Sequence, residues 1–233
     1  MQVAPLKLII HDSCKKLGAE VNEYLVESRR QINHEHKATP EYYGYERDNY
    51  TTDYVCPRFG TGEGKAELKE SVRGMDVYIL ADVVNHSLTY RINQFENHMS
   101  PDDIYSDVKR IIAAIAGKAH RITVILPFLY ESRQHKRYGR ESLDCAISLV
   151  ELHAMGVDNI VTFDAHDPKV QNATPLYGFD NFIPPYQFIQ ALIHYERDLI
   201  IDKEHLVVIS PDEGALDRAV YFAGVLGVNT GMF

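Results

Sequence analysis

With 233 residues, 45% of them hydrophobic, the chain has room for one large or two small α/β domains, and its net charge of −9 disfavours a broad nucleic-acid footprint. No apolar run approaches the roughly 20 residues that span a bilayer, and residues 1–10 lack the cationic start and small-residue cleavage site of a signal peptide. Cys14, Cys56 and Cys145 stand alone without a CxxC pair, which argues for a reducing compartment, so we expect a cytoplasmic protein that binds neither nucleic acid nor membrane.

The first part of the chain predicts one strand and one helix before the pattern breaks. Residues 6–10 form an apolar run of strand length that ends at His11 and Asp12. Residues 28–56 are polar and rich in tyrosine, which predicts a long loop that is either a binding arm or a surface excursion, with His34 and its neighbours on the surface. Between these segments, apolar residues at helical spacing predict the inner face of a helix: Leu17, Val21, Tyr24 and Leu25.

A strand and a strongly marked helix follow. Residues 77–80 predict a strand that ends at Asp82. Residues 100–103, Ser-Pro-Asp-Asp, predict a helix start, because proline suits the first turn and the carboxylates complement the helix dipole. The apolar stripe of this helix is predicted at Ile104, Val108, Ile111, Ile112 and Ile115.

Residues 121–167 carry the most informative pattern. Residues 122–126 predict a buried strand, and a loop with several cationic side chains follows it. Next comes a predicted helix with Ser142 as its N-cap and Gly156 at its end. Residues 160–163 predict a second strand, which runs directly into the tetrad Asp-Ala-His-Asp. The predicted apolar positions of the helix are Leu143, Ala146, Ile147, Val150 and Ala154.

This strand–helix–strand spacing predicts two parallel, neighbouring strands. Ligands of parallel sheets bind outside the carboxyl ends of the strands. The cationic loop and the tetrad both lie at that edge, so we place a site for a small anionic ligand there. The polar residues involved are Arg133, Gln134, His135, Lys136, Arg137, Arg140, Asp164, His166 and Asp167.

The remaining residues predict the opening of a second domain. Turn formers and aromatics in residues 175–185 mark a boundary. Helices are predicted around residues 188–193 and 216–223, and strands at 206–209 and within 227–233. The strand at 206–209 ends in Ser-Pro-Asp-Glu-Gly, which places Asp212 at another carboxyl edge. The predicted fold is therefore α/β, with a parallel-sheet domain in residues 1–181 and the start of a second domain in residues 182–233.

Several short segments, in matching order, resemble the amino-terminal part of the ribose-phosphate pyrophosphokinases, the PRPP synthetases. They are RFGTGE (58–63), VRGMDV (72–77), RITVILPF (121–128), SRQ (132–134), FDAH (163–166) and VISPD (208–212). The resemblance implies a phosphoribosyltransferase-like fold in both domains. It also implies Mg²⁺-dependent transfer of the diphosphate of ATP to ribose 5-phosphate, and self-association as dimers within larger rings.

The resemblance further implies roles for single residues. Arg133 and Gln134 resemble an ATP-contacting pair, with Lys136 beside them, since a guanidinium can fork onto phosphate oxygens and an amide can bind a base or ribose. His166 and Asp212 match the positions assigned to magnesium, for which the carboxylate is the more natural ligand. The other candidate contacts resemble the loop that receives adenine from a neighbouring subunit: Phe59, as a stacking platform, Thr61, Gly62 and Glu63.

The chain also departs from the family pattern. Thr61 and His135 stand where acidic residues are usual, and Ala146 stands where a lysine is usual. The family's catalytic lysine–arginine pair and its ribose 5-phosphate loop have no counterpart before Phe233. We therefore expect the 233-residue polypeptide, as a fragment or a natural short form, to hold the ATP and metal half of the site and to be inactive alone.

Two alternatives stay open. The first is a catalytically silent homologue that binds nucleotide and regulates or scaffolds a true synthetase. The second is an unrelated metal-dependent phosphohydrolase, in which Asp12, Asp164, His166 and Asp212 would have to converge on one or two metal ions.

Overall fold

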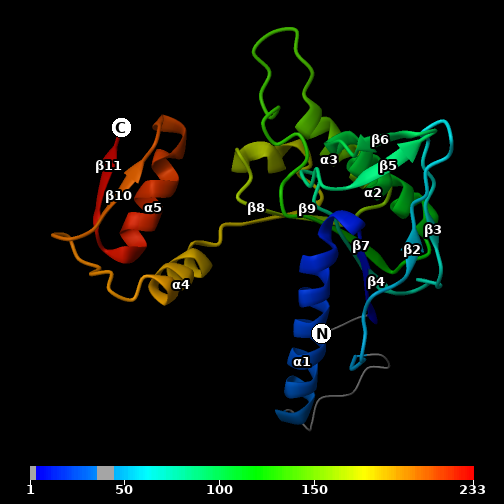
Figure 1. The fold of residues 1–233 in the computed structure, drawn as a ribbon, viewed down its shortest axis with the longest axis horizontal. Helices are drawn as coiled ribbons and strands as arrows, with labels where there is room; N and C mark the ends of the chain where they lie inside the picture. Colours follow the sequence, from blue (N-terminus) through cyan, green and yellow to red (C-terminus); the bar gives the residue numbers. More distant parts are fainter. Residues whose placement is uncertain (1–3, 36–44) are drawn as a thin grey trace. The chain divides into compact units, whose positions relative to one another are not determined.

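The computed structural model describes residues 4–35 and 45–233 of the chain (Figure 1). The chain divides into two compact units, Met1–Phe182 and Ile183–Phe233. The boundary predicted between residues 181 and 182 lies next to this division. Within the part of the chain that is described, no helix combines the length and the apolar character needed to cross a membrane.

The first unit is built on a five-stranded sheet in the order β1-β4-β7-β8-β9, with every pair parallel. The predicted strands at residues 6–10, 77–80, 122–126 and 160–163 are confirmed, and β7 pairs with β8 as expected. β9 was not predicted, because its sequence GFDNF lies in the turn-rich boundary segment and has few apolar residues. The strands are β1 (Leu6–Ile10), β4 (Asp76–Leu80), β7 (Arg121–Leu126), β8 (Asn159–Phe163) and β9 (Gly178–Phe182).

Two later parts of the chain flank β1, one along each edge of this strand. Helix α1 (Lys15–Glu35) follows β1, and the chain then returns along the other edge of that strand. There the N–H of Leu8 donates to Tyr50 O and the N–H of Thr52 donates to Leu8 O, both at 2.8 Å. The remaining strands of the sheet lie on the opposite side of β1. Crossovers in both directions place helices on both faces of a parallel sheet.

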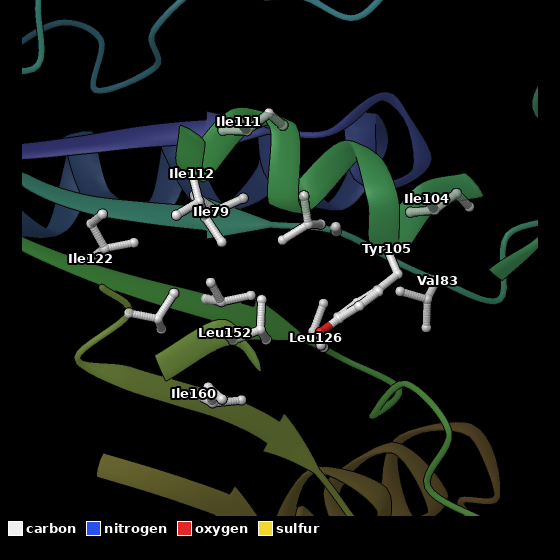
Figure 2. Close-up of a cluster of buried hydrophobic side chains, with 14 of the residues drawn as sticks. Ile79, Val83, Ile104, Tyr105, Ile111, Ile112, Ile122, Leu126, Leu152 and Ile160 are labelled. Atoms are coloured by element: carbon white, nitrogen blue, oxygen red, sulfur yellow. The ribbon is translucent and has the colours of Figure 1, made fainter. Parts of the chain in front are cut away.

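Side-chain packing shows which helix covers which face. Ile9, Val77 and Ile79 belong to one core cluster together with residues of α2 (Pro101–Ile115) and α3 (Asp144–Ala154). Leu6 and Leu8, whose side chains alternate with Ile9 along β1, belong to a smaller cluster with residues of α1. Figure 2 shows part of the larger cluster, between α2, α3 and the strands β4, β7 and β8.

Helix α2 forms as predicted. Ser100 is its N-cap, and the Ser100 hydroxyl accepts a hydrogen bond from the N–H of Asp103 at 3.1 Å while the Asp103 side chain accepts from the N–H of Ser100, a reciprocal capping box. All predicted stripe positions are buried: Ile104, Val108, Ile111, Ile112 and Ile115. The helix is therefore fixed at its start by hydrogen bonds and along its length by the core.

Helix α1 corrects the prediction for residues 28–56. The helix continues to Glu35, so residues 28–35 are helical and not part of a loop. Long polar side chains have good helix propensity, and this helix continues without a wide apolar stripe. His34 is exposed, as interpreted. Residues 36–44 lie outside the described part of the chain.

The inner face of α1 is also rotated relative to the prediction. Val21 and Leu25 pack against the smaller cluster, whereas Leu17 and Tyr24 are exposed. The reason is Gly18, where a Cβ atom would lie only 2.2 Å from Ile10 Cγ2. The glycine lets the helix approach β1 closely on the face of Gly18, Val21 and Leu25.

The buried face of α3 differs from the prediction too. Ile147, Val150 and Ala154 are exposed. Polar residues can take the buried face because they find partners within it: Ser148 Oγ donates to Cys145 O at 2.8 Å. The buried residues are Cys145, Ser148, Leu149, Leu152 and His153. The predicted N-cap is wrong as well, since α3 begins at Asp144 and Ser142 donates to the Asp144 carboxylate instead.

Short antiparallel pairs complete the first unit: β2 (Tyr54–Val55) with β3 (Glu67–Leu68), and β5 (Thr89–Ile92) with β6 (Phe95–His98). The second unit contains α4 (Pro185–Tyr195), β10 (Val207–Ser210), α5 (Leu216–Leu226) and β11 (Asn229–Met232). β10 and β11 pair in parallel, and α5 packs on both. The predicted helices and strands of this unit are confirmed, whereas its being the start of a second phosphoribosyltransferase-like domain stays a prediction.

Candidate functional site

The loop after β7 and the residues after β8 meet at the carboxyl edge of the sheet. We call residues 127–143 the basic loop. Ser132, buried in this loop, accepts a hydrogen bond from the backbone N–H of His166 at 3.0 Å. The ring centres of His135 and His166 lie 5.1 Å apart. The two segments that the strand–helix–strand pattern predicted to meet do meet, and ligand binding there stays a prediction.

Asp167 joins these segments through charge. Its Oδ2 lies 3.3 Å from Nε2 of His135 and 3.4 Å from Nζ of Lys136. Its Oδ1 accepts the N–H of Lys169 at 2.9 Å, which caps the turn η2 (Pro168–Ala173). The hydrogen bond from Lys169, followed by the contact with Lys136 and the charge of His135, lowers the pKa of Asp167 below its usual value. The ionised carboxylate therefore ties the basic loop to the end of β8.

The cationic side chains of the basic loop are mostly free. Arg133, Arg137 and Arg140 are exposed, and within residues 4–35 and 45–233 none of them has an ion-pair partner. Lys136 is exposed despite its contact with Asp167. Positive charge that the fold does not neutralise is available to an anionic ligand at this edge.

Gln134 is engaged inside the basic loop. Its Nε2 donates to Ser142 O at 2.7 Å and to Lys136 O at 3.3 Å. Its backbone O accepts the N–H of Cys145 at 3.3 Å. These contacts tie the middle of the basic loop to its carboxyl end, so the amide nitrogen of Gln134 stabilises the conformation of the loop. Contact between Gln134 and ATP stays a prediction.

The second group of candidate contacts lies in a tight turn, residues 58–64, which we call the anchored turn. The N–H of Phe59 donates to Glu63 O at 2.7 Å, and the N–H of Gly62 donates to Phe59 O at 2.8 Å. Gly62 has φ of +90°, a conformation that favours glycine. Phe59, Thr61 and Glu63 are exposed, and Thr61 Oγ1 donates to the Glu63 carboxylate at 2.8 Å. The turn therefore carries three exposed side chains on a well-fixed backbone.

A buried ion pair that was not predicted holds this turn. Nη1 and Nη2 of Arg58 lie 2.6 and 2.8 Å from Oδ1 and Oδ2 of Asp107, and the two side chains are only 7% and 2% exposed. Arg110 also donates to Asp107 at 2.7 Å, and Nε2 of His11 lies 3.6 Å from it. Burial alone would raise the pKa of Asp107, but the contact with His11, the hydrogen bonds from Arg58 and the charge of Arg58 outweigh it and lower the pKa.

In the second unit, Asp212 follows β10 as predicted. Its Oδ1 accepts the N–H of Ala215 at 2.8 Å and caps the turn η3 (Glu213–Ala215). Buried Ser210 donates to Asp212 O at 2.7 Å, which fixes the backbone at the end of the strand. The Asp212 side chain is exposed, so part of its carboxylate is open to a ligand.

The magnesium candidates, His166 and Asp212, lie in different units. In the described ranges, no group of three or more His, Cys, Asp or Glu side chains is arranged to hold a metal ion. Taken by itself, the exposed carboxylate of Asp212 fits Mg²⁺ when the ion keeps several waters and takes further oxygens from substrate phosphates. The residues therefore fit an ion that arrives with a nucleotide better than one that the protein alone encloses.

Comparison with known families gives the deciding observation. The family described as the N-terminal domain of ribose phosphate pyrophosphokinase matches residues 6–156. The chain belongs to the ribose-phosphate pyrophosphokinase family. The matched region contains β1, β4 and β7, the anchored turn and the basic loop, whereas the tetrad after β8 and Asp212 lie beyond it.

Curated relatives agree with this assignment. The ribose-phosphate pyrophosphokinase of Corynebacterium efficiens is 31% identical over 177 residues, which are 76% of this chain and 49% of the relative. That of Mycobacterium tuberculosis is 30% identical over 193 residues, 82% of this chain and 53% of the relative. The chain thus spans about half the length of these relatives.

The crystal structure of phosphoribosylpyrophosphate synthetase from Mycobacterium smegmatis shares the fold. It superposes with a TM-score of 0.70 at 24% identity, over 98% of this chain and 63% of that one. The predicted fold class, an α/β protein with a parallel-sheet, phosphoribosyltransferase-like domain, is therefore confirmed.

Proposed function

We propose that the protein is a ribose-phosphate diphosphokinase, which transfers the diphosphate of ATP as one unit to ribose 5-phosphate and yields PRPP and AMP. The observation that carries the proposal is the joined carboxyl edge of β7 and β8 in a member of this family. There, the backbone of His166 is held by Ser132 while Arg133 remains exposed and unpaired in the described structure.

In this reaction the anomeric oxygen of ribose 5-phosphate bonds to the β-phosphorus, the bond from that phosphorus to the oxygen of AMP breaks, and the hydroxyl proton is lost. Such a transfer needs charge neutralisation and alignment more than a nucleophilic side chain. The planar guanidinium of Arg133 can bind two phosphate oxygens at once. Lys136 adds a second positive charge that is held near the site by Asp167.

His166 and Asp212 are the residues that would hold Mg²⁺, which when bound supplies further neutralisation of phosphate charge. Asp212 offers the oxygen ligand that this ion prefers. His166 would donate to a phosphate or orient a metal-bound water, because its backbone is fixed by Ser132 while its ring is exposed.

The anchored turn is proposed to receive adenine, with Phe59 as the stacking platform and Thr61, Gly62 and Glu63 around the base. In this arrangement the turn serves the nucleotide of a neighbouring subunit, so the protein would act as a dimer or a larger ring. Its three cysteines are free, in keeping with a cytoplasmic location.

The sheet order argues against the one-metal form of the alternative phosphohydrolase. Asp12 follows β1 and Asp164 follows β8, and the order β1-β4-β7-β8 separates these strand ends by three steps. At about 4.8 Å per strand this is roughly 14 Å, too far for both carboxylates to share one metal ion.

The test is a coupled assay, on the protein at its natural length, for AMP release that depends on ribose 5-phosphate, with Mg²⁺ present. We expect such turnover. Binding of Mg-ATP without turnover would favour the catalytically silent homologue, and ATP hydrolysis that ignores ribose 5-phosphate would favour a hydrolase.

The same assay on the 233-residue polypeptide is expected to give no PRPP. These residues supply the ATP and metal side of the proposed site, and approximation of two substrates is worth roughly 7–11 kcal/mol of the barrier. Turnover by this polypeptide would mean that it builds the acceptor site from residues not identified above.

A further inference from the structure

We propose that Asp107 is a positioning residue for nucleotide recognition: through Arg58 it fixes the anchored turn so that Phe59 and Glu63 are presented to the base. The proposal rests on the proposed function of this turn. It concerns a residue of α2 that touches no substrate itself.

The contact between Asp107 and Arg58 fixes orientation as well as distance. The two terminal nitrogens of Arg58, Nη1 and Nη2, donate in parallel to the two carboxylate oxygens of Asp107, at 2.6 and 2.8 Å. This pair of bonds defines the plane of the Arg58 guanidinium. The guanidinium carbon also lies 5.4 Å from the ring centre of Tyr90 in β5. Because both side chains of the ion pair are almost fully buried, water does not compete for these bonds.

Asp107 is itself held from several sides. It lies on α2, whose apolar stripe is buried in the main core. Arg110 donates to its Oδ1 at 2.7 Å, and His11, at the end of β1, lies 3.6 Å from its Oδ2. The carboxylate therefore links the anchored turn to the core and to the carboxyl edge of the sheet.

The backbone at the far end of the turn also fits against this ion pair. Arg58 pairs with Gly64 across the base of the turn. A Cβ atom on Gly64 would lie 2.1 Å from Nη1 of Arg58 and 2.9 Å from Nη1 of Arg110. A side chain at this position would therefore displace the guanidinium groups, which pass directly against the backbone, from their contacts with Asp107.

The opposite side of the turn contacts the β5–β6 hairpin. A Cβ atom on Gly62 would lie 2.8 Å from Cδ1 of Ile92. Gly60 differs from both other glycines, since a Cβ atom there would meet nothing within 4 Å. The turn is therefore held at Arg58, Gly62 and Gly64, whereas Gly60 has open space and is not among the candidate contacts.

The experiment measures base discrimination in the protein at its natural length, as the ratio of kcat/KM for ATP to kcat/KM for GTP. Asp107→Asn and Gly64→Ala are compared with the matched control Gly60→Ala. Because both nucleotides are assayed on one preparation, the fraction of folded protein cancels in the ratio. We expect the ratio to fall on the order of tenfold in the first two variants, as for a small misplacement of binding groups, and less than about twofold in the control.

The double variant Arg58→Met/Asp107→Leu separates positioning from stability. Apolar residues can replace a buried ion pair without loss of stability, but they give the turn no directional contact. We expect the thermal unfolding midpoint to recover relative to Asp107→Leu while discrimination stays low. The proposal is overturned if the double variant recovers both the unfolding midpoint and the base discrimination. It is also overturned if discrimination is unchanged in Asp107→Asn and Gly64→Ala.

Failure of the proposed function gives a different result. If the wild-type protein shows no turnover that depends on ribose 5-phosphate, the same variants are compared by calorimetric affinity for Mg-ATP and Mg-GTP. A discrimination that is lost in Asp107→Asn and Gly64→Ala and kept in Gly60→Ala then supports the positioning role without catalysis. A wild-type protein that binds neither nucleotide overturns both.

Discussion

The anchored turn and the basic loop are both candidate nucleotide contacts, but their cationic side chains differ in burial and pairing. In the anchored turn, Arg58 is buried and paired with Asp107. In the basic loop, Arg133 is exposed and Lys136 is 54% exposed beside Asp167. The difference shows that the fold uses one cation for its own structure and leaves the others exposed. Variants of the two regions should therefore differ in what they damage.

The largest effect is expected from Asp107→Leu. The substitution leaves Arg58 buried without its partner, which should lower the free energy of unfolding by about 3–5 kcal/mol. Urea denaturation measures it, with Lys136→Met as the matched removal of one partner from the exposed bridge, for which we expect less than about 1 kcal/mol. Equal losses in the two variants would erase the distinction between the regions.

Arg133→Ala should leave stability within about 0.5 kcal/mol, since the side chain is exposed. Affinity for Mg-ATP should instead fall by about 1.5–3 kcal/mol, the usual worth of hydrogen bonds to a charged group. Calorimetry measures it, and Arg140→Ala is the control from the same loop. If the two substitutions lower the affinity for Mg-ATP equally, the basic loop attracts nucleotide only through its overall charge.

Acid should remove the contribution of Asp167 to stability. The lowered pKa of Asp167 means that its ionised form stabilises the fold above the ordinary aspartate pKa of about 3.9, and that this contribution is lost as the pH falls through the lowered folded value. Thermal melts of Asp167→Asn and the wild-type protein should therefore differ at neutral pH and converge in strong acid.

Salt should distinguish the contribution of Asp167 to stability from that of Asp107. At 1 M salt the screening length is about 3 Å, so the difference between Asp167→Asn and the wild-type protein should shrink. The difference for Asp107→Asn should persist, because that carboxylate is shielded from solvent. A salt effect of equal size on both would contradict the burial of the Arg58–Asp107 pair.

The smallest effect is expected from Thr61→Val. It removes one exposed hydrogen bond to Glu63 and should change stability by less than about 0.5 kcal/mol. If the turn contacts adenine through its backbone, affinity for Mg-ATP should also change less than about twofold. A larger loss would show that the hydroxyl replaces the acidic side chain usual at this position.

The sequence predicts the fold best where several local signals agree. Helix α2 has a capping box at Ser100 and an apolar stripe with one consistent period, and both are found as predicted. Helix α3 has apolar residues on both faces, so its period is ambiguous, and burial of Ser148 and Cys145 depends on contacts that form only in the fold. Strand β9 carries too little apolar character to be distinguished from the turn around it.

The same reasoning explains the incomplete prediction of the site. Strand ends place Asp167, His166 and the basic loop together, because parallel strands share one carboxyl edge. Asp107 gave a local signal, since it lies three residues after Ile104 within a buried stripe and a buried carboxylate must be paired. Its partner Arg58 is 49 residues away, and no local pattern selects it from 24 lysines and arginines.

The order of the sheet has a consequence for biosynthesis. From β1 through β4, β7 and β8 to β9, each strand pairs with one that left the ribosome earlier, and no strand of the sheet must be inserted between two others. The sheet can therefore grow at one edge while the chain emerges. Between completion of β8 at Phe163 and of β9 at Phe182, the edge formed by β8 has no partner on that side. At about 5–20 residues per second, this interval lasts roughly 1–4 s, whereas the edge of β7 waits roughly 2–7 s between Leu126 and completion of β8 at Phe163. The time for which the growing edge is open to another nascent chain therefore shortens as the sheet is extended.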